Sequence, residues 1–374
     1  QCKKYIEDPE KLPRVGFYFD NTKKDHVAFR HYFNFVKDCH EKNMEVIVIK
    51  GPVALGSSSA ELEINCSSTI QLSNNLKDSI ITLRSLELDM LIYTEMHSSA
   101  TPYCLAHNRI APIQAVLPGN LITTGIKTID YFITSDQVET HNSHNLYTER
   151  LIKLKGMPHG ITEIAKISNK KGRDFFDLPE KSHIFSLLFN LIKFHPDWDM
   201  MLEKIAQDNV DSIFILTGKG SQPSLFLRKR WKETAPTFLS KCNFFEWLSK
   251  DDYFNLLSCS DVALDPIHMG CGTTSIDALS VGVPIITKPG DHPRTRIAYG
   301  LYKIMGIKNA PIADSDSSYI KYCSKILTNN PKWIQLKKSI KSNYSKVSNA
   351  NRQSVNQLTE EIKMLTKQTS SYKE

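Results

Sequence analysis

DVALDPIHMGCGTTSIDALSVGVPIITKPG, residues 261–290, is the stretch that decides the fold. Apolar runs over 261–266 and 283–288 have the length and composition of buried strands, and a glycine-rich connection between them leads into a helical pattern that ends at Gly282. A strand, a tight turn, a helix and a second strand in this order form one βαβ unit, which builds a parallel sheet. The sequence therefore predicts an α/β fold.

The same alternation continues outward from this stretch. Amphipathic spacing predicts a helix over 25–40, and a polar connection over 158–181 separates two groups of apolar runs. The remaining strand candidates are 14–20, 44–50, 89–94, 112–117, 130–135, 149–154, 182–189 and 211–218. We expect an N-terminal Rossmann-like domain over 1–165, a second over 166–345, and a C-terminal helix and tail over 346–374. Two such parallel sheets place a ligand cleft between the carboxyl ends of their strands.

The composition is that of a folded globular protein. The chain has 374 residues, of which 41% are apolar and 23% charged, so a sizeable core is expected. Its net charge of +7 comes from lysines spread along the chain. Dispersed lysines favour solvated surfaces over a nucleic-acid groove, so no nucleic-acid partner is predicted.

The sequence also indicates where in the cell the protein is expected. It has no apolar run of about 18 residues and no signal-peptide core near its start, so neither a membrane span nor a secretory signal is predicted. Its 8 cysteines form no CxxC pair, which favours a reducing environment, and we expect a cytoplasmic protein. Because the chain begins at Gln1 and not at a methionine, we expect further sequence upstream.

The glycine-rich connection has the features of a phosphate-binding turn. A loop that runs into a helix N-terminus presents backbone N–H groups and the positive end of the helix dipole, where phosphate binds well. Thr273 and Thr274 add hydroxyl donors, and Asp277 offers an acceptor for a ribose. The alternative is structural, with Thr274 as the N-cap and Asp277 completing a capping box. The stretch is neither a Walker loop nor a GxGxxG fingerprint.

Two long motifs together resemble one known family. Residues 261–290, followed by RTRIAYGLYKIMGI (294–307), resemble the donor-site segment of the O-GlcNAc transferase family and its bacterial relatives, including the adhesin N-glycosyltransferases. LAHNRIAPIQAVLPGNLITTGIKTIDYFITS (105–135) resembles the family's other signature. The resemblance spans residues 14 to about 310. It implies a GT-B fold, with two Rossmann-like domains facing across a cleft.

The resemblance also implies an activity. The expected reaction is inverting, metal-independent transfer of glucose or N-acetylglucosamine from a UDP-sugar. The UDP-sugar is a co-substrate, so no cofactor and no metal are expected. The commonest acceptor in the family is a protein side chain, either Ser/Thr or Asn.

The family's donor contacts carry over to particular positions. FNLIKFHP (189–196) matches the segment whose lysine contacts the pyrophosphate, which makes Lys193 a catalytic candidate. A lysine there stabilises the charge that develops on the leaving diphosphate, in place of a metal. Lys250 and Tyr253 match the segment that holds the nucleobase. Without the resemblance, Lys193 reads as a surface residue and Tyr253 as a half-buried helix aromatic.

The glycine-rich stretch supplies the other donor residues. Thr273 and Thr274 match paired threonines at the donor phosphates, and Asp277 matches the acid at the ribose. Gly272 is a donor-site position where enzymes of the human type have a histidine, so this sequence departs from the family there.

Histidines are the candidates on the acceptor side. DHVAFRHYF (25–33) resembles the family's His-rich helix start, which places His26 near the acceptor and His31 behind it. His97 follows a predicted strand and is a second catalytic candidate. Imidazole, whose unperturbed pKa is about 6.5, is suited to orient or deprotonate an acceptor. A structural role stays open for each of these histidines.

The loop GNLITTG (119–125) is the other acceptor-side segment. Asn120, Thr123 and Thr124 are the residues expected to face the acceptor. Many relatives carry His-Pro or Tyr-Pro where this loop has Asn120 and Leu121, so its acceptor chemistry departs from theirs.

Other functions stay open at this stage. One is a transferase that uses a GDP-sugar or a glycan acceptor. Another is a catalytically inactive nucleotide-sugar-binding protein, which the substitutions at Gly272, Tyr253 and Asn120 allow. Relatives also use tetratricopeptide repeats to hold protein substrates, and these are absent here unless they precede Gln1.

Overall fold

The computed structural model describes residues 12–24, 26–52, 60–97, 99–161, 167–324 and 331–372. Contacts divide the chain into two units. The first comprises residues 1–162 and 349–374, and the second comprises 163–348. The predicted boundary between 165 and 166 lies outside the described residues. The C-terminal segment, set apart in the prediction from residue 346, groups with the first unit from residue 349.

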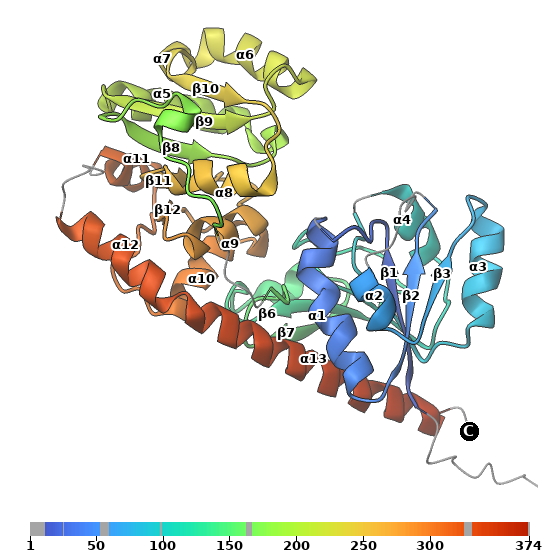
Figure 1. Ribbon diagram of the computed structural model, residues 1–374. Helices are drawn as coiled ribbons and strands as arrows, with labels where there is room; N and C mark the ends of the chain where they lie inside the picture. The colour runs from blue at the N-terminus through green and yellow to red at the C-terminus, as the bar shows by residue number, and fades with distance from the viewer. Residues whose placement is uncertain are drawn as a thin grey trace, which may run out of the picture. The chain divides into compact units, whose positions relative to one another are not determined.

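The first unit contains a parallel sheet of seven strands among its described residues, in the order β3-β2-β1-β4-β5-β6-β7 (Figure 1). The strands are β1 Arg14–Phe19, β2 Glu45–Lys50, β3 Ser68–Gln71, β4 Met90–Tyr93, β5 Ile113–Val116, β6 Tyr131–Ser135 and β7 Arg150–Leu154. The helices are α1 Val27–Glu41, α2 Ala60–Ile64, α3 Leu76–Ser85, α4 Ala100–Ala106, the 3-10 turn η1 Ser143–Leu146, and most of α13 Ser345–Tyr372. The strand order reverses at β1, so β1 and β4 flank a switch point where such sheets bind ligands.

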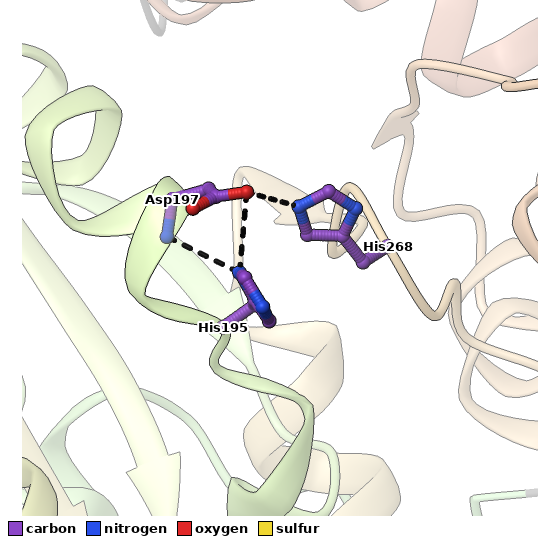
Figure 2. A group of neighbouring side chains, drawn as sticks. All are labelled: His195, Asp197 and His268. Carbon is purple, nitrogen blue, oxygen red and sulfur yellow. Dashed lines mark hydrogen bonds and ion pairs between the residues drawn. The ribbon is translucent and has the colours of Figure 1, made fainter.

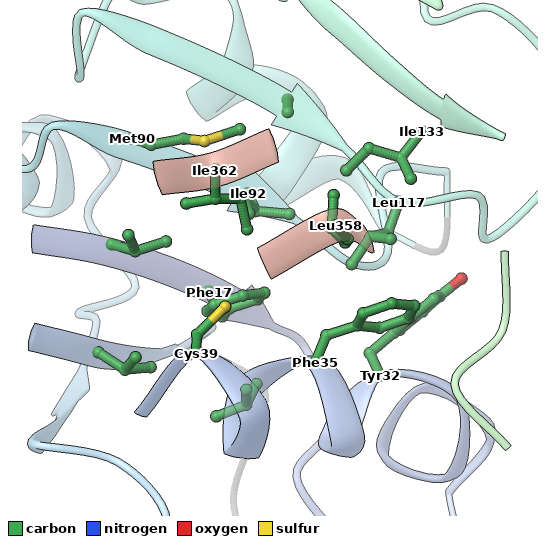
Figure 3. Close-up of a cluster of buried hydrophobic side chains, with 14 of the residues drawn as sticks. Phe17, Tyr32, Phe35, Cys39, Met90, Ile92, Leu117, Ile133, Leu358 and Ile362 are labelled. Carbon is green, nitrogen blue, oxygen red and sulfur yellow. The ribbon is translucent and has the colours of Figure 1, made fainter. Parts of the chain in front are cut away.

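Helix α13 contributes to the core of the first unit. Leu358 and Ile362 are fully buried in the cluster that includes Cys39 of α1 and Met90 and Ile92 of β4 (Figure 3). The backbone N–H groups of Gly156 and Met157 also donate to side chains of α13. Residues of α13, almost 200 positions after Gly156 in the sequence, therefore complete the core of the first unit.

We predict that Ile362→Ala lowers the free energy of unfolding of the first unit by about 2–5 kcal/mol, because it leaves a cavity in a close-packed core. Met364→Ala on the same helix is the matched control, since Met364 is 48% exposed and should cost less than about 0.5 kcal/mol. Urea denaturation followed by circular dichroism measures both. Equal effects of the two substitutions would contradict the packing of α13 described above.

The second unit has a parallel sheet of five strands among its described residues, in the order β10-β9-β8-β11-β12. The strands are β8 His183–Leu187, β9 Ser212–Thr217, β10 Cys242–Phe245, β11 Val262–Leu264 and β12 Ile285–Ile286. The helices are α5 Asp199–Asp208, α6 Gln222–Thr234, α7 Pro236–Ser240, α8 Lys250–Ser258, α9 Thr273–Ser280, α10 Ile297–Met305, α11 Asp316–Ser324 and α12 Pro331–Asn343. Short 3-10 turns are η2 Asp174–Phe176, η3 Leu191–Lys193, η4 Pro196–Trp198 and η5 Pro293–Thr295. Here the order reverses at β8, so the switch point lies between β8 and β11.

Every strand predicted from the sequence is present, and the predicted helix over 25–40 is α1. The helix of the 261–290 stretch ends as predicted, with Gly282 at a φ of +86° in the left-handed region that glycine favours. Two strands were missed, β3 and β10. Both lie at a sheet edge, where one side lacks a neighbour and the apolar signal is weak.

Candidate functional site

Lys193 lies at the switch point of the second unit. It ends the short turn η3, which follows β8, and its Nζ donates to the carbonyl of Gly270, 2.8 Å away, in the loop after β11. Because β8 and β11 are adjacent and parallel, the loops that follow them meet at the carboxyl ends of these strands. The structure thus brings Lys193 to the glycine-rich connection, 77 residues away in sequence.

Helix α9 begins at this loop. Gly272 is its N-cap, and the carbonyl of Gly272 accepts from the N–H groups of Ser275 and Ile276 at 3.0 and 3.3 Å. The alternative with Thr274 as N-cap is therefore wrong, since Thr273 and Thr274 are the first two residues of the helix. Backbone N–H groups in the first turn of a helix form its positive end. The geometry is that of an anion-binding turn.

The remaining donor candidates of this unit lie on α8 and α9. Asp277 is only 4% exposed and belongs to the packed side of α9. Lys250 is the exposed first residue of α8, and Tyr253 is half-buried one turn later, with its ring against Phe254. Helix α8, which carries both residues, packs against α9, the helix that begins at the glycine-rich loop.

Asp265 is a buried residue of this loop that the sequence analysis did not single out. Its carboxylate accepts from the N–H of Cys271 and the hydroxyl of Thr287, both at 2.7 Å. Burial raises the pKa of Asp265 to about 6, although these hydrogen bonds and the charge of Lys193 act in the opposite direction. Asp265 therefore fixes the loop that carries Gly270 and Gly272. An aspartate at a strand end is too common in sequences to signal this role.

The first unit has a pocket at its own switch point. Its volume is about 260 Å³, and its lining comes from the segments that follow β1, β4 and β5 and from the start of α1. His26, His31, His97 and Asn120, which the sequence analysis assigns to the acceptor side, all line it. The structure thus gathers four predicted residues that are up to 94 positions apart in the sequence (120 − 26 = 94).

Thr123 and Thr124 lie elsewhere. Neither lines this pocket in the described part of the chain. The Thr123 hydroxyl donates to the carboxylate of Glu149 at 2.7 Å, and Thr124 donates to it from both its backbone N–H and its hydroxyl. These contacts give both threonines a structural role in holding the loop to the segment before β7.

Glu95 lines the same pocket and was missed by the sequence analysis. It follows β4, is 6% exposed, and accepts from the backbone N–H groups of Asp20 and Asn21 at 2.8 and 3.1 Å. Burial raises the pKa of Glu95 from its usual 4.5 to about 7, against the lowering effect of these two hydrogen bonds. A carboxylate that titrates near neutrality in a pocket is suited to accept a proton. Only its position after a strand could have indicated it.

His26 lies beside Glu95, with its Nδ1 3.7 Å from the nearer carboxylate oxygen. As the N-cap of α1, Nδ1 accepts from the N–H of Ala28 at 3.3 Å. Burial lowers the pKa of His26, so its ring is neutral at physiological pH. A neutral ring that accepts at Nδ1 carries its proton on Nε2, where it is a donor and not a base. His26 is thus placed to orient a substrate.

The other two pocket histidines differ in exposure. His31 is buried, and its ring lies 4.4 Å from that of His159 in an edge-to-face contact. Burial and the neighbouring His159 hold the pKa of His31 well below its usual value. His97 is exposed at the pocket mouth. His31 is therefore a buried residue of the pocket wall that packs against His159, and His97 is the accessible histidine.

Known structures show which fold class the chain has. No protein-family model matches the chain. A variant O-GlcNAc transferase of Thermobaculum terrenum superposes with a TM-score of 0.84 at 17% identity, over 98% of this chain and 70% of that one. HepE of Anabaena, solved in complex with UDP, superposes with a TM-score of 0.57 at 11% identity, over 93% of this chain and 100% of that one. The fold is that of the GT-B glycosyltransferases, as the sequence predicts.

Curated sequences narrow the resemblance within that class. The chain is 25% identical, over 62% of its length, to a protein of Arabidopsis thaliana described as "probable UDP-N-acetylglucosamine–peptide N-acetylglucosaminyltransferase SEC", and covers 24% of that protein. It is 22% identical, over 71% of its length, to the similarly described SPINDLY protein of Solanum lycopersicum, and covers 28% of it. The predicted resemblance to the O-GlcNAc transferases is confirmed. The chain spans about a quarter of the length of these relatives.

None of the helices in the described part of the chain combines the length and the apolar character needed to cross a bilayer.

Proposed function

We propose that this chain is an inverting, metal-independent glycosyltransferase that moves glucose or N-acetylglucosamine from a UDP-sugar to a protein side chain, Ser/Thr or Asn. The observation that carries the proposal is the contact of Lys193 with the glycine-rich loop at the start of α9. Known proteins also support the proposal. Two relatives are described as probable peptide N-acetylglucosaminyltransferases, and one structural neighbour was solved with UDP.

In this proposal the donor diphosphate binds at the start of α9. The N–H groups of Thr273 and Thr274 and the helix dipole attract the phosphates. Lys193 exchanges its hydrogen bond to the Gly270 carbonyl for one to a phosphate oxygen, and neutralises the charge that builds up as the bond from the sugar C1 to UDP breaks. Fixed positive groups of this kind supply the stabilisation for which other transferases use a metal.

On the acceptor side we propose Glu95 as the general base. In an inverting transfer the acceptor atom attacks C1 from the face opposite the leaving UDP and loses a proton as the new bond forms. The proton passes to the Glu95 carboxylate, while the Nε2–H of His26 orients the acceptor. This differs from the sequence-based prediction, in which His26 or His97 is the base.

A second candidate is a nucleotide-sugar-binding protein without transferase activity. It is favoured by Gly272, which stands at the N-cap of α9 where the family resemblance places a histidine. A transferase that uses a GDP-sugar or a glycan acceptor is the third.

The cysteines bear on the proposed location. The seven described cysteines are free thiols, as expected in a reducing compartment, so we propose a cytoplasmic location.

A donor screen separates these candidates. The protein is incubated singly with UDP-glucose, UDP-N-acetylglucosamine and GDP-sugars, with and without a cell-derived protein mixture, and products are identified by mass spectrometry. Sugar transfer or donor hydrolysis with a UDP-sugar that persists in the presence of a chelator supports the proposal. Turnover of a GDP-sugar alone supports the third candidate. UDP binding without any turnover supports the binding protein.

The departure at Gly272 gives a further prediction. We expect Gly272→His to fold normally, because a Cβ at this position meets no atom within 4 Å and φ is −87°. A histidine donor there should tighten UDP binding by about tenfold or more, since a hydrogen bond to a charged group contributes about 1.5–3 kcal/mol. Calorimetric titration with UDP measures the change.

Gly270→His is the matched control for that substitution. A Cβ at Gly270 lies 3.1 Å from the carbonyl of Arg294 and 3.2 Å from the carboxylate of Asp265, so this variant should lose stability and gain no affinity. Unchanged or weaker UDP binding by a folded Gly272→His protein would place the phosphates away from the N-cap.

A further inference from the structure

Three side chains of the second unit converge outside the contacts used above. His195 directly precedes η4, Asp197 lies within η4, and His268 lies in the loop after β11 (Figure 2). One candidate ligand atom from each residue lies within 4.8 Å of the others. All three side chains are about half exposed, so solvent ions reach them.

The distances suit a small metal ion. His268 Nε2 is 2.8 Å and His195 Nδ1 is 3.4 Å from the same oxygen, Asp197 Oδ2. Two ligands bound tetrahedrally to zinc at about 2.0–2.1 Å lie roughly 3.3 Å apart. Small rotations of the side chains would therefore give the required geometry, with further coordination positions open to water.

One contact of the cluster favours a cation. In the neutral ring, His195 Nδ1 accepts from the backbone N–H of Asp197 at 3.3 Å and presents a lone pair toward the carboxylate. Two acceptor atoms, His195 Nδ1 and Asp197 Oδ2, thus face each other at 3.4 Å. A cation between them replaces this repulsion with two coordinate bonds, at the expense of one long hydrogen bond.

We propose that His195, Asp197 and His268 form a binding site for a divalent transition-metal ion such as Zn²⁺. Two imidazole nitrogens and one carboxylate oxygen are a ligand set that such ions prefer. The bound ion ties the loop after β8 to the loop after β11 and so stabilises the second unit. Binding requires neither a donor nor an acceptor, so the proposal does not depend on the function proposed above and leaves the transfer step metal-independent.

The test uses the full chain without a polyhistidine tag. Zn²⁺ is titrated calorimetrically, and Co²⁺ is titrated with detection of its visible absorption, which reports nitrogen and oxygen ligands, whereas a cysteine ligand adds a near-ultraviolet charge-transfer band. His268→Ala is the main variant, because the ring of His268 contacts the two other members of the cluster, with a hydrogen bond to Asp197 and an edge-to-face contact with the ring of His195. His141→Ala removes an exposed histidine of the first unit and is the control.

We expect one Zn²⁺ per chain and a Co²⁺ spectrum without the cysteine band. His268→Ala and Asp197→Asn should each weaken binding at least about tenfold, and His141→Ala should not change it. Zn²⁺ should raise the melting temperature of the wild type and of His141→Ala, but not of His268→Ala. Absence of saturable binding, a cysteine band, or unchanged binding by a folded His268→Ala protein would overturn the proposal.

Discussion

Replacing Lys193 with alanine should lower kcat for sugar transfer by at least about 100-fold, because one fixed donor at a developing charge contributes this much or more to the rate. The protein should stay folded. The substitution removes one partly exposed hydrogen bond, from Nζ to the Gly270 carbonyl, which contributes about 1 kcal/mol to stability. Initial rates of UDP release measure the effect, and circular dichroism monitors the fold.

Lys204→Ala is the matched control for this substitution. Lys204 is exposed on α5 of the same unit and pairs with Asp208 four residues later, and neither residue belongs to the proposed donor site. Its loss should leave kcat unchanged. Retained activity of Lys193→Ala would remove Lys193 from the donor site, and an equal loss in both variants would point to a general effect of charge.

Glu95→Gln should lower kcat by about 100-fold or more, since general-base catalysis contributes about 10²–10⁴. The glutamine oxygen can still accept from Asp20 and Asn21, so the variant keeps the local structure and loses only the ionisable group. With a base whose pKa is about 7, the wild-type rate should fall as the pH drops below 7, and this limb should be absent in the variant.

The same raised pKa predicts a stability effect that is independent of activity. Between its usual pKa of 4.5 and about 7, Glu95 holds its proton in the folded state and has lost it in the unfolded state. The stability contributed by this group is therefore full below pH 4.5, falls as the pH rises to about 7, and is constant above that. Urea denaturation across this range should show a shallower decline for Glu95→Gln than for the wild type. Glu61→Gln, an exposed carboxylate of the same unit, serves as the control.

The sequence predicts most of the fold because buried parallel strands are continuous apolar runs. This signal located β1 and β11, which are covered on both faces, and missed the edge strands β3 and β10. It did not show that Leu358 and Ile362 return to the first unit. An amphipathic helix reveals that it has an apolar face but not which sheet that face covers.

The candidate site was predicted only in part. The family motif indicated Lys193, and the structure places it against the glycine-rich loop, whereas Thr274 was wrongly offered as an N-cap. Glu95 carries no sequence signal, because its raised pKa results from burial that only the folded chain creates. The cluster of Asp197 with His268 joins residues 71 positions apart, so no spacing rule could find it.

Calorimetric titration with UDP and with uridine tests the central claim, that the start of α9 and Lys193 hold a nucleotide diphosphate. The account predicts one saturable UDP site per chain, weakened at least about tenfold in Lys193→Ala because a charge-assisted hydrogen bond is lost. Uridine, which lacks phosphates, should bind weakly and equally to both proteins. Absence of UDP binding, or the same UDP affinity in the wild type and in a folded Lys193→Ala protein, would contradict the account.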